Sequence, residues 1–452
     1  MPQKKRTSKT TAGIISLGCP RNQLDSEVIA GLLKENGFTI VDLSAGADVC
    51  VVNTCAFIRS AREESVEAIL EAVELKKKGK VGCLVVCGCL PQLYKEKLAL
   101  ELEEADLVIG TSDFPKLPQL LDSMHKGGVR SVVSSKPDYL YNEKSPRIIF
   151  TPDHYTYLKI SEGCSNFCSY CIISRLRGAF RSRSIKSVAE EIRRLSGPGK
   201  LKELNLIGQD TTLFGVDRYG KPMLGGLLRK ICGLDNSVEW IRILYTHPAH
   251  YTKELISVIR NEDKICKYLD LPIQHISDHI LKKMNRRVTK SDILNLIERL
   301  RKNIPGIVLR TSIITGFPGE SDKDFDELVK FLRDTRFERL GAFVYSQEEG
   351  TKAAKFNNQI PEKVKRHRLD VLMEEQKRIS LDINKRYLNK TLDVLIDEKC
   401  ADEKDKFMGR TRGDAPEVDG MVYVTGKGVK VGQIYKVKIK DTLEYDLVGD
   451  KI

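Results

Sequence analysis

The chain has 452 residues, of which 41% are hydrophobic and 30% charged, a balance typical of a folded protein large enough for two or three domains. No stretch approaches the ~18 uninterrupted apolar residues that a membrane span needs. The basic, polar N-terminus lacks the apolar core of a secretory signal. These features argue against membrane and secreted proteins, and we expect a cytoplasmic protein without a membrane partner.

Lysine and arginine outnumber aspartate and glutamate by 75 to 62, which gives a net charge of +13. Such a surplus favours an RNA or ribosomal partner, although a merely soluble basic surface explains it equally well. The chain also has 12 cysteines. In a reducing compartment these are metal ligands, redox groups or buried thiols rather than disulfides.

The first region alternates short apolar strands with amphipathic helices, which predicts an α/β domain with a doubly wound parallel sheet. We place this domain at residues 13–132. The predicted strands are 13–17, 48–52, 82–86 and 107–109, and the predicted helices are 26–34 and 61–76. Residues 133–150 show no periodicity, contain two prolines and are predicted to form a linker.

A second series of six strand–helix units predicts an open, partial (βα)6 barrel over residues 151–386, since a closed eight-stranded barrel needs two more units. Its predicted strands are 157–160, 203–207, 240–244, 268–271, 308–314 and 340–344. Ser187 is the predicted N-terminal cap of one helix, and Thr289 opens a predicted capping box. Residues 388–452 contain short strands and glycine-rich turns, which predict a small all-β, OB-like barrel.

Three cysteines, Cys164, Cys168 and Cys171, follow directly on a predicted strand. We call them the central cysteine set. Thiolates at these spacings can bind three irons of one cubane cluster if the chain wraps around it, and Gly163 suits such a loop. A four-iron cluster normally takes four cysteines, so one iron would stay open to another ligand. The alternatives are a buried helix face and a zinc site, which would want a fourth ligand nearby.

This CxxxCxxC motif after the first strand of a partial barrel resembles the signature of the radical-SAM superfamily. The resemblance implies a 4Fe-4S cluster whose open iron chelates S-adenosylmethionine, and reductive cleavage of that cofactor to a 5′-deoxyadenosyl radical. It further implies that Tyr170 lies near the adenine and that Gln209, Ser312 and Gly316 help to bind the cofactor. Taken alone, the last three could equally be residues of ordinary strand-end turns.

Three other cysteines, Cys19, Cys55 and Cys89, each come just after a predicted strand, and we call them the N-terminal cysteine set. Ligands of open parallel sheets gather at the carboxyl ends of the strands, so these thiols should share one edge. Spacing alone leaves open a second metal cluster or three buried structural thiols.

The N-terminal set, the central motif and the C-terminal barrel, in this order, resemble the methylthiotransferase family. That resemblance implies a second 4Fe-4S cluster on the N-terminal set and a C-terminal TRAM domain. Three further cysteines have no counterpart that we can place: Cys50, Cys83 and Cys87. The first two lie within predicted strands and should be core residues, whereas a role for Cys87 at the cluster edge stays open.

Two substrate branches compete within this family, a transfer-RNA adenosine and an aspartate of ribosomal small-subunit protein twelve. Several strings resemble the ribosomal-protein branch: SLGCPRN at 16–22, NTCAFI at 53–58, GCLPQ at 88–92, NLIGQDTT at 205–212, PIQHISD at 272–278 and APEVDG at 415–420. Three residues depart from the usual pattern without removing a ligand or a charge: Ala56, Ser174 and Gly208.

The resemblance therefore implies insertion of a methylthio group at the β-carbon of an aspartate. No ordinary side chain can break that C–H bond, so the cofactors must carry the chemistry and we assign no catalytic side chain. Flavodoxin is the kind of electron donor expected. The alternative from another class is a non-catalytic iron–sulfur protein that binds RNA or the ribosome.

Five further side chains are candidates for other roles near these motifs. Three arginines could bind the substrate carboxylate or could form a solvated basic loop: Arg177, Arg181 and Arg183. His247 and His275 lie at predicted strand ends, where structural histidines are commoner than ligands.

Overall fold

The computed structural model describes residues 10–124, 130–197, 199–401, 403 and 405–452. Its contacts divide the chain into two compact units. Unit 1 contains the described residues up to Phe150 together with segments 161–167 and 171–183, and unit 2 contains segments 151–160 and 168–170 and everything from Ser184 onward. Each unit is described by itself below.

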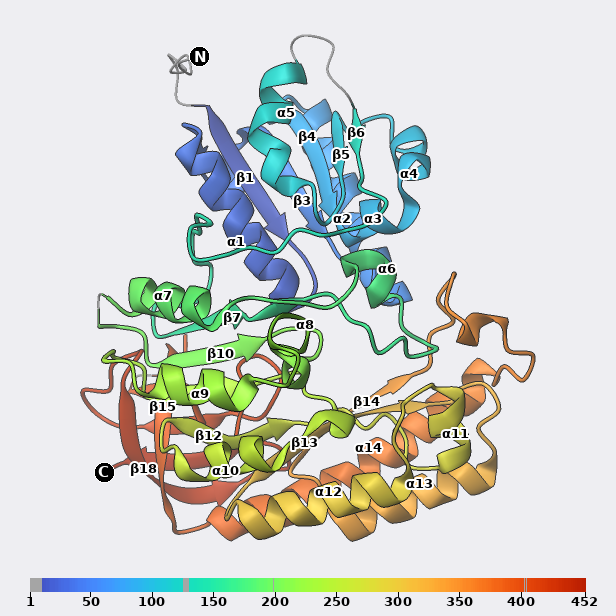
Figure 1. Cartoon of the computed structure of the whole chain (residues 1–452). Helices are drawn as coiled ribbons and strands as arrows, with labels where there is room; N and C mark the ends of the chain where they lie inside the picture. Colours follow the sequence, from blue (N-terminus) through green and yellow to red (C-terminus); the bar gives the residue numbers. More distant parts are fainter. Residues whose placement is uncertain (1–9, 125–129, 198, 402, 404) are drawn as a thin grey trace. The chain divides into compact units, whose positions relative to one another are not determined.

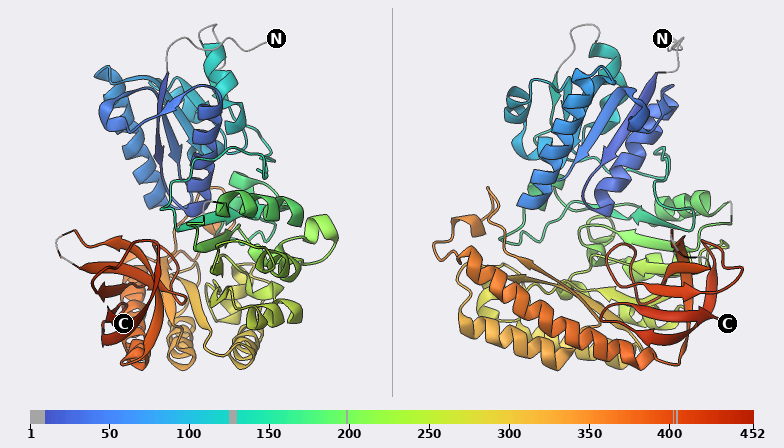
Figure 2. Two further views of the ribbon diagram at one scale, coloured as in Figure 1. Left: turned by 90° about the vertical axis from the view of Figure 1, so that its left-hand side faces the viewer. Right: turned by 180° about the vertical axis from the view of Figure 1, so that it is seen from behind.

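Unit 1 is built on a six-stranded parallel sheet with strand order β2-β1-β3-β4-β5-β6 (Figure 1). Its strands are β1 (Thr11–Ser16), β2 (Thr39–Ile40), β3 (Ala47–Thr54), β4 (Val81–Gly88), β5 (Leu107–Ile109) and β6 (Ser131–Val132). Its helices are α1 (Pro20–Glu35), α2 (Arg59–Lys77), α3 (Cys89–Tyr94), α4 (Glu96–Glu101) and α5 (Leu117–Met124). Figure 2 shows helices on both faces of this sheet, which is the predicted doubly wound arrangement.

Alternation along the central strands explains why both faces of this sheet are covered. On one face, Cys50 and Val52 of β3 pack with Ala68 and Ile69 of α2. The intervening residues of β3 point to the other face and are also buried, so the strand is a nearly continuous apolar run. Sequence analysis missed the two edge strands β2 and β6, because two residues are too few for a periodic signal.

The later segments of unit 1 pack onto this same domain. They contain β8 (Ser161–Glu162), α6 (Ile173–Arg177) and β9 (Arg181–Ser182), and β8 pairs antiparallel with β9. Ile172 and Leu176 belong to the apolar core beneath α2 and β4, and the Thr111 hydroxyl donates to the Leu176 carbonyl at 2.6 Å. Segments 161–167 and 171–183, which flank the middle of the central motif in sequence, are therefore part of the N-terminal fold.

Unit 2 contains a second six-stranded parallel sheet, with order β14-β13-β12-β11-β10-β7 and unpaired outer edges, as the open (βα)6 prediction requires. Its strands are β7 (Tyr155–Lys159), β10 (Glu203–Ile207), β11 (Trp240–Ile243), β12 (Ile265–Asp270), β13 (Val308–Thr315) and β14 (Arg339–Val344). Its helices are α7 (Ile185–Ser196), α8 (Val216–Tyr219), α9 (Leu224–Cys232), α10 (Lys253–Asn261), α11 (Asp278–Lys283), α12 (Lys290–Asn303), α13 (Asp322–Thr335) and α14 (Glu362–Asn384).

Two helix starts test the predicted caps. Thr289 forms the predicted capping box with Asp292 at the start of α12. The prediction for α7 was wrong, because Ser184 is its cap and accepts from the N–H of Ser187, which lies in the first turn. A serine three residues inside a helix and its true cap look alike in sequence, since both precede an apolar run.

The strands of this sheet alternate between an apolar outer face and a polar inner face. Leu204 and Leu206 of β10 belong to the large core beneath the helices, whereas Glu203 and Asn205, which alternate with them, point inward and are fully buried. The same alternation places Arg242 inside the barrel. The sheet therefore encloses polar groups, of which Glu203 and Arg242 pair with each other at 2.8 Å.

The remaining strands form a closed five-stranded barrel, β15-β16-β17-β19-β18, as expected for the C-terminal region. They are β15 (Thr391–Lys399), β16 (Lys406–Thr411), β17 (Val422–Thr425), β18 (Ile434–Thr442) and β19 (Leu447–Lys451). Sequence analysis missed β16 and β19, in which glycine interrupts the apolar alternation.

This C-terminal barrel binds to the base of the partial barrel, where the parallel strands begin. Arg410 of β16 contacts Glu203 at 2.7 Å and Asp397 at 2.7 Å, and Glu203 also pairs with Arg242 at 2.8 Å. The segment APEVDG at 415–420 lies at the same base and supplies Asp419, which accepts the Tyr268 hydroxyl at 2.7 Å. We call these charged groups the base network.

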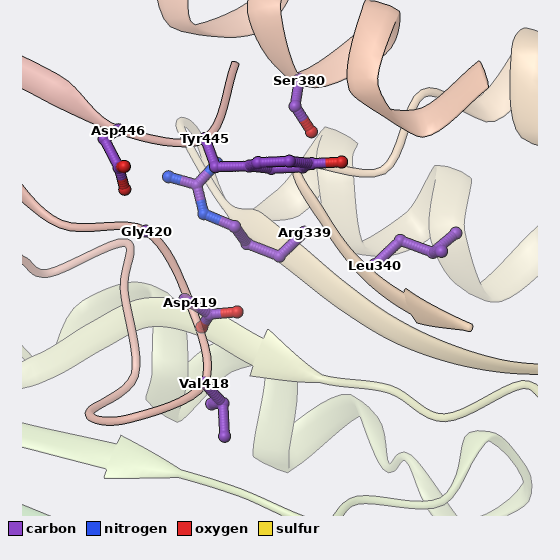
Figure 3. Close-up of a pocket in the computed structure, with 8 residues that line it drawn as sticks. All are labelled: Arg339, Leu340, Ser380, Val418, Asp419, Gly420, Tyr445 and Asp446. Atoms are coloured by element: carbon purple, nitrogen blue, oxygen red, sulfur yellow. The ribbon is translucent and has the colours of Figure 1, made fainter. Parts of the chain in front are cut away.

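A cavity of about 220 Å³ lies beside the base network (Figure 3). Its walls come from the start of β14, from α14 and from loops of the C-terminal barrel: Arg339, Leu340, Ser380, Val418, Asp419, Gly420, Tyr445 and Asp446. The Arg339 guanidinium is already paired with Asp414 at 2.6 Å. The cavity is smaller than the ~300 Å³ at which ligand pockets begin, so it is a packing feature of this interface.

Candidate metal centres

The N-terminal cysteine set lies at one edge of the sheet of unit 1. Cys19 follows β1, Cys55 follows β3 and Cys89 follows β4, and these three strands are neighbours in the sheet. The thiols lie close enough to influence one another, because the neighbouring thiols Cys89 and Cys19 add to burial in raising the pKa of Cys55 to about 12. Metal binding would have to deprotonate such thiols, and a bound metal would supply the driving force.

Two glycines make room for this set. Gly18 has φ +84°, and a Cβ at that position would lie 2.7 Å from the Cys55 sulfur. Gly88 has φ +96°, and a Cβ there would lie 2.4 Å from the Asn53 side-chain oxygen. Only glycine fits at these two turns, because a side chain would be strained by the backbone and would also collide with the site.

Buried asparagines tie together the loops that carry the thiols. The Asn22 side-chain amide donates to the carbonyls of Leu17 at 2.8 Å and Asn53 at 3.2 Å. Asn53 returns a hydrogen bond to the Asn22 carbonyl at 2.9 Å, and Ser65 holds both backbone groups of Cys55. These hydrogen bonds hold the loops that carry Cys19 and Cys55 to each other and to α2.

One buried arginine, Arg177, borders this set. It donates to the Cys89 sulfur at 3.4 Å and to the Asn22 side-chain oxygen at 3.0 Å, and it pairs with Asp25. Although burial opposes the shift, the guanidinium groups of Arg21 and Arg177 lower the pKa of Cys19. The site therefore offers three thiols and a positive group that favours thiolates, which fits an iron–sulfur cluster.

The other cysteines of this domain lie along the strands rather than at the edge. Cys50 is fully buried in β3, and Cys83 and Cys87 belong to β4. Burial raises the pKa of all three thiols. Cys87 is the one next to the edge, since its pKa also responds to Asp25 and Cys89.

The central cysteine set sits on a loop whose shape is fixed on the unit 1 side by close backbone contacts. Gly163 has φ +79°, and a Cβ there would lie 2.1 Å from the Ala179 carbonyl oxygen. The backbone N–H of Cys164 donates to the Gly178 carbonyl at 3.2 Å. These contacts show why glycine precedes the first cysteine of the motif.

The middle of the motif, Cys168 to Tyr170, belongs to unit 2. Ser169 donates its hydroxyl to the Lys283 carbonyl at 2.7 Å, and its own carbonyl accepts the N–H of Ala353 at 2.8 Å. The buried Arg286 guanidinium donates to the Cys168 sulfur at 3.7 Å. A sulfur with a cationic donor beside it suits a thiolate ligand.

The residues predicted to bind the cofactor lie at or near the carboxyl ends of unit 2 strands. Tyr170 packs against an apolar cluster that includes Phe317, the residue after Gly316. Gln209 follows β10 and Ser312 lies in β13, so these two are separated by β11 and β12 in the sheet. The structure thus brings Tyr170 and the Gly316 loop together and leaves Gln209 and Ser312 on different strands.

Glu320, which sequence analysis missed, holds the Gly316 loop in shape. Its carboxylate accepts the backbone N–H of Gly316 at 2.7 Å and of Phe317 at 3.2 Å, and it pairs with the buried Arg368 at 2.8 Å. Burial raises the pKa of Glu320 to about 7, against the pull of Arg368. The available sequence signal was a glutamate two residues after the Phe317-Pro318 pair.

Asp210, His247 and His250 form the closest group of potential metal ligands in the described chain, with atoms within 4.8 Å of one another. Their hydrogen bonds explain the grouping without a metal. The His250 ring nitrogen lies 2.9 Å from the Asp210 carboxylate, and His247 accepts the Ala249 N–H on Nδ1 at 3.2 Å. His247, whose pKa burial lowers to about 2, therefore carries its proton on Nε2. The group orders the loops after β10 and β11.

The arginines after the central motif make structural contacts. Arg177 is buried beside Asp25, and the Arg183 guanidinium stacks on the Tyr141 ring at 4.5 Å and is 2% exposed. Arg181 donates to the backbone carbonyls of Ala179 and Tyr139. Each guanidinium therefore has partners within the fold, and binding of a substrate carboxylate by these arginines stays a prediction.

Comparison with known families matches all three regions of the chain. The radical SAM superfamily matches residues 158–332, the uncharacterized protein family UPF0004 matches residues 11–110, and the TRAM domain matches residues 390–452. Among the described residues, no helix is both long and apolar enough to span a membrane.

Solved structures agree with the fold. The radical S-adenosylmethionine methyltransferase TsrM from Kitasatospora setae aligns with a TM-score of 0.56 and 15% identity, over 74% of this chain and 73% of that chain. The cobalamin-dependent S-adenosylmethionine radical enzyme OxsB aligns with a TM-score of 0.52 and 13% identity, over 82% of this chain and 56% of that chain. The fold is therefore that of the radical SAM enzymes.

Several curated proteins named ribosomal protein uS12 methylthiotransferase RimO are similar over nearly the whole chain. That of Clostridioides difficile (strain 630) is 46% identical over 96% of this chain and 97% of its own length. That of Syntrophotalea carbinolica is 45% identical over 100% of this chain and 98% of its own length. That of Geotalea uraniireducens is 44% identical, with 98% of each chain covered. The chain belongs to this RimO family of methylthiotransferases.

Proposed function

We propose that this chain is a methylthiotransferase that inserts a methylthio group at the β-carbon of an aspartate in ribosomal protein uS12. The observation that carries the proposal is that one chain contains both the central CxxxCxxC motif and the N-terminal cysteine set, whose three thiols lie at one edge of the unit 1 sheet. Similarity to proteins of that name over at least 96% of this chain supports the substrate.

We assign the cluster and cofactor sites by residue. The central set would hold one 4Fe-4S cluster with an open iron for S-adenosylmethionine, and the N-terminal set would hold an auxiliary cluster. Tyr170, Gln209, Ser312 and Gly316 are the proposed cofactor contacts. Together these groups supply, when bound, the one-electron chemistry that removes hydrogen from an unactivated carbon and provides sulfur.

The protein's own contribution is to bind, orient and protect these groups. The Glu320–Arg368 pair presets the Gly316 loop, so the backbone there needs no reorganisation when a ligand binds. Arg286 and Arg177 each donate to one cysteine sulfur. The burial of these groups keeps water away from the thiols and strengthens each contact.

The domain boundaries form part of the proposal. We propose an N-terminal methylthiotransferase domain at 13–132, a linker at 133–150, a radical-SAM domain at 151–386 and a TRAM domain at 388–452. An electron donor of the flavodoxin kind and a docking contact with the ribosome would complete the system.

The test of substrate is mass spectrometry of ribosomal proteins and transfer RNA from a deletion strain. We expect the methylthio mass on uS12 to disappear, to return with the wild-type gene and to stay absent with a Cys168→Ala gene. Loss of methylthioadenosine from transfer RNA with modified uS12 would contradict the ribosomal-protein assignment.

A further inference from the structure

Arg177 stands out because it belongs to the segment after the central cysteine motif, yet its guanidinium borders the N-terminal cysteine set. Both lie within unit 1, so the contact belongs to one compact fold. Its side chain is 5% exposed, and that of its partner Asp25 is 7% exposed. A buried ion pair is costly to assemble and is weak evidence for stability alone, so its position calls for another explanation.

The contacts of Arg177 converge on the thiols. One terminal nitrogen donates to both the Cys89 sulfur at 3.4 Å and the Asn22 side-chain oxygen at 3.0 Å, and the other pairs with Asp25. Asn22 in turn holds the loops that carry Cys19 and Cys55, through the carbonyls of Leu17 and Asn53. One guanidinium thus contacts a thiol of the set directly and the other two loops through Asn22.

Hydrogen bonds to sulfur and nearby charge are two of the factors that set the potential of an iron–sulfur cluster. A positive group stabilises the reduced cluster, which carries more negative charge, and therefore raises the potential. The Asp25 carboxylate has the opposite effect. Burial strengthens both, because the local dielectric is low.

We propose that Arg177 is a positioning residue that orients Cys89 and, balanced by Asp25, sets the reduction potential of the auxiliary cluster. The inference rests on the proposed auxiliary cluster. It gives the segment that follows the central motif a second task, which is to adjust the redox behaviour of the other metal site.

The experiment isolates the auxiliary cluster in the full chain by changing Cys164, Cys168 and Cys171 to Ala. After anaerobic reconstitution this parent should hold about four irons. An EPR-monitored redox titration then gives its midpoint potential. A parent that holds almost no iron overturns the auxiliary cluster itself, and this is recognised before any arginine is changed.

Two single variants of this parent should shift the potential in opposite directions. Arg177→Met should make it more negative, because a positive group and a sulfur donor are lost. Asp25→Asn should make it more positive, because a negative group is lost while the amide can still accept. Arg183→Met is the matched control, since Arg183 is as buried and in the same segment but stacks on Tyr141. Arg177→Lys should stay closer to the parent than Arg177→Met.

A purely structural role predicts no opposed shifts. Equal potentials in Arg177→Met, Asp25→Asn and the control would overturn the proposal, as would shifts of the same sign. If a single variant does not fold, the double variant Asp25→Asn/Arg177→Met decides, because it removes both members of the Asp25–Arg177 pair. Its potential should still fall below that of the control through loss of the sulfur donor, and a potential no lower than the control overturns the proposal.

Discussion

In each unit, a buried arginine donates a hydrogen bond to a cysteine sulfur. The two arginines differ in whether a neighbouring carboxylate balances their positive charge. In unit 1, Arg177 donates to Cys89 and is paired with the Asp25 carboxylate. In unit 2, Arg286 donates to Cys168 and to the Pro272 carbonyl, and among the described residues no carboxylate lies within 4 Å of it. Asp210, which is paired with His250, contributes to the electrostatic environment of Arg286.

This difference suits the two proposed tasks. Arg177 orients the Cys89 sulfur, and its pairing with Asp25 means that it adds little net charge. This arrangement suits the auxiliary cluster, which we propose at the edge of the unit 1 sheet. An arginine without a carboxylate partner leaves net positive charge beside a cluster that must be reduced and must receive an anionic carboxylate from its cofactor. The same residue type therefore serves two electrostatic settings within one chain.

The largest expected effect separates the two sets outright. Replacing all three thiols of either set by alanine should lower iron from about eight to about four per chain and abolish methylthio transfer. Cleavage of S-adenosylmethionine should be lost only with the central set, because we assign the S-adenosylmethionine site to the cluster of that set. Iron analysis and liquid chromatography of 5′-deoxyadenosine measure both outcomes. Cleavage that survives loss of the central set would contradict the assignment.

Adding a single methyl group at Gly18 should have a smaller effect, namely loss of iron from the N-terminal set alone. Gly18→Ala should cost that set its iron, because the new Cβ would lie 2.7 Å from the Cys55 sulfur. Gly37→Ala is the matched control, since its φ of +86° imposes the same strain of about 1 kcal/mol with nothing within 4 Å. Iron counts and melting curves distinguish the two. Equal iron in both variants would show that the close contact is irrelevant.

The charge comparison itself can be tested by potentials. Arg286→Met, measured with the N-terminal set replaced by alanine, should lower the potential of the remaining cluster more than Asp25→Asn/Arg177→Met lowers that of the auxiliary cluster. The reason is that the double variant leaves the net charge unchanged, whereas Arg286→Met removes one positive charge. Redox titration followed by EPR gives both values. A smaller shift for Arg286→Met would refute the contrast.

The smallest expected effect is a loss of folding stability at acidic pH. Unit 2 contains the fully buried His275, whose pKa burial lowers to about 3, whereas the described part of unit 1 contains no histidine. In the unfolded chain His275 binds a proton with a pKa near 6.5, whereas in the folded chain it stays neutral at that pH. His275 should therefore lower the free energy of unfolding by about 1.4 kcal/mol per pH unit below pH 6.5, in addition to the fall that His247 causes in the same way.

The control for this effect is His275→Gln, which should remove that slope while the titration of the neighbouring Glu320 remains in both proteins. Denaturant unfolding at pH 7.5 and pH 5.5 gives the difference. An identical pH dependence in parent and variant would mean that His275 is protonated in the folded protein.

Much of this architecture could be predicted from sequence, because periodic apolar segments and strand-end cysteines are local signals. The placement of Cys19, Cys55 and Cys89 at one edge follows from parallel strands alone. The partners of Arg177 could not be predicted, since Asp25 lies 152 residues away and no local pattern links them. Tertiary burial decides whether the arginines of a basic run such as 177–183 are solvated or enclosed, and here Arg177 and Arg183 are buried whereas Arg181 is only half-buried.

The base network also limits which C-terminal barrels can be combined with this partial barrel. Glu203 and Arg242 belong to the partial barrel, whereas Arg410 and Asp419 belong to the C-terminal region. The first three are buried, and the side chain of Asp419 is 3% exposed. Loss of either side leaves unpaired charge at a cost of about 3–5 kcal/mol. The C-terminal barrel is therefore not an exchangeable module, and a chimera between relatives should fold only when both halves of the network are inherited together.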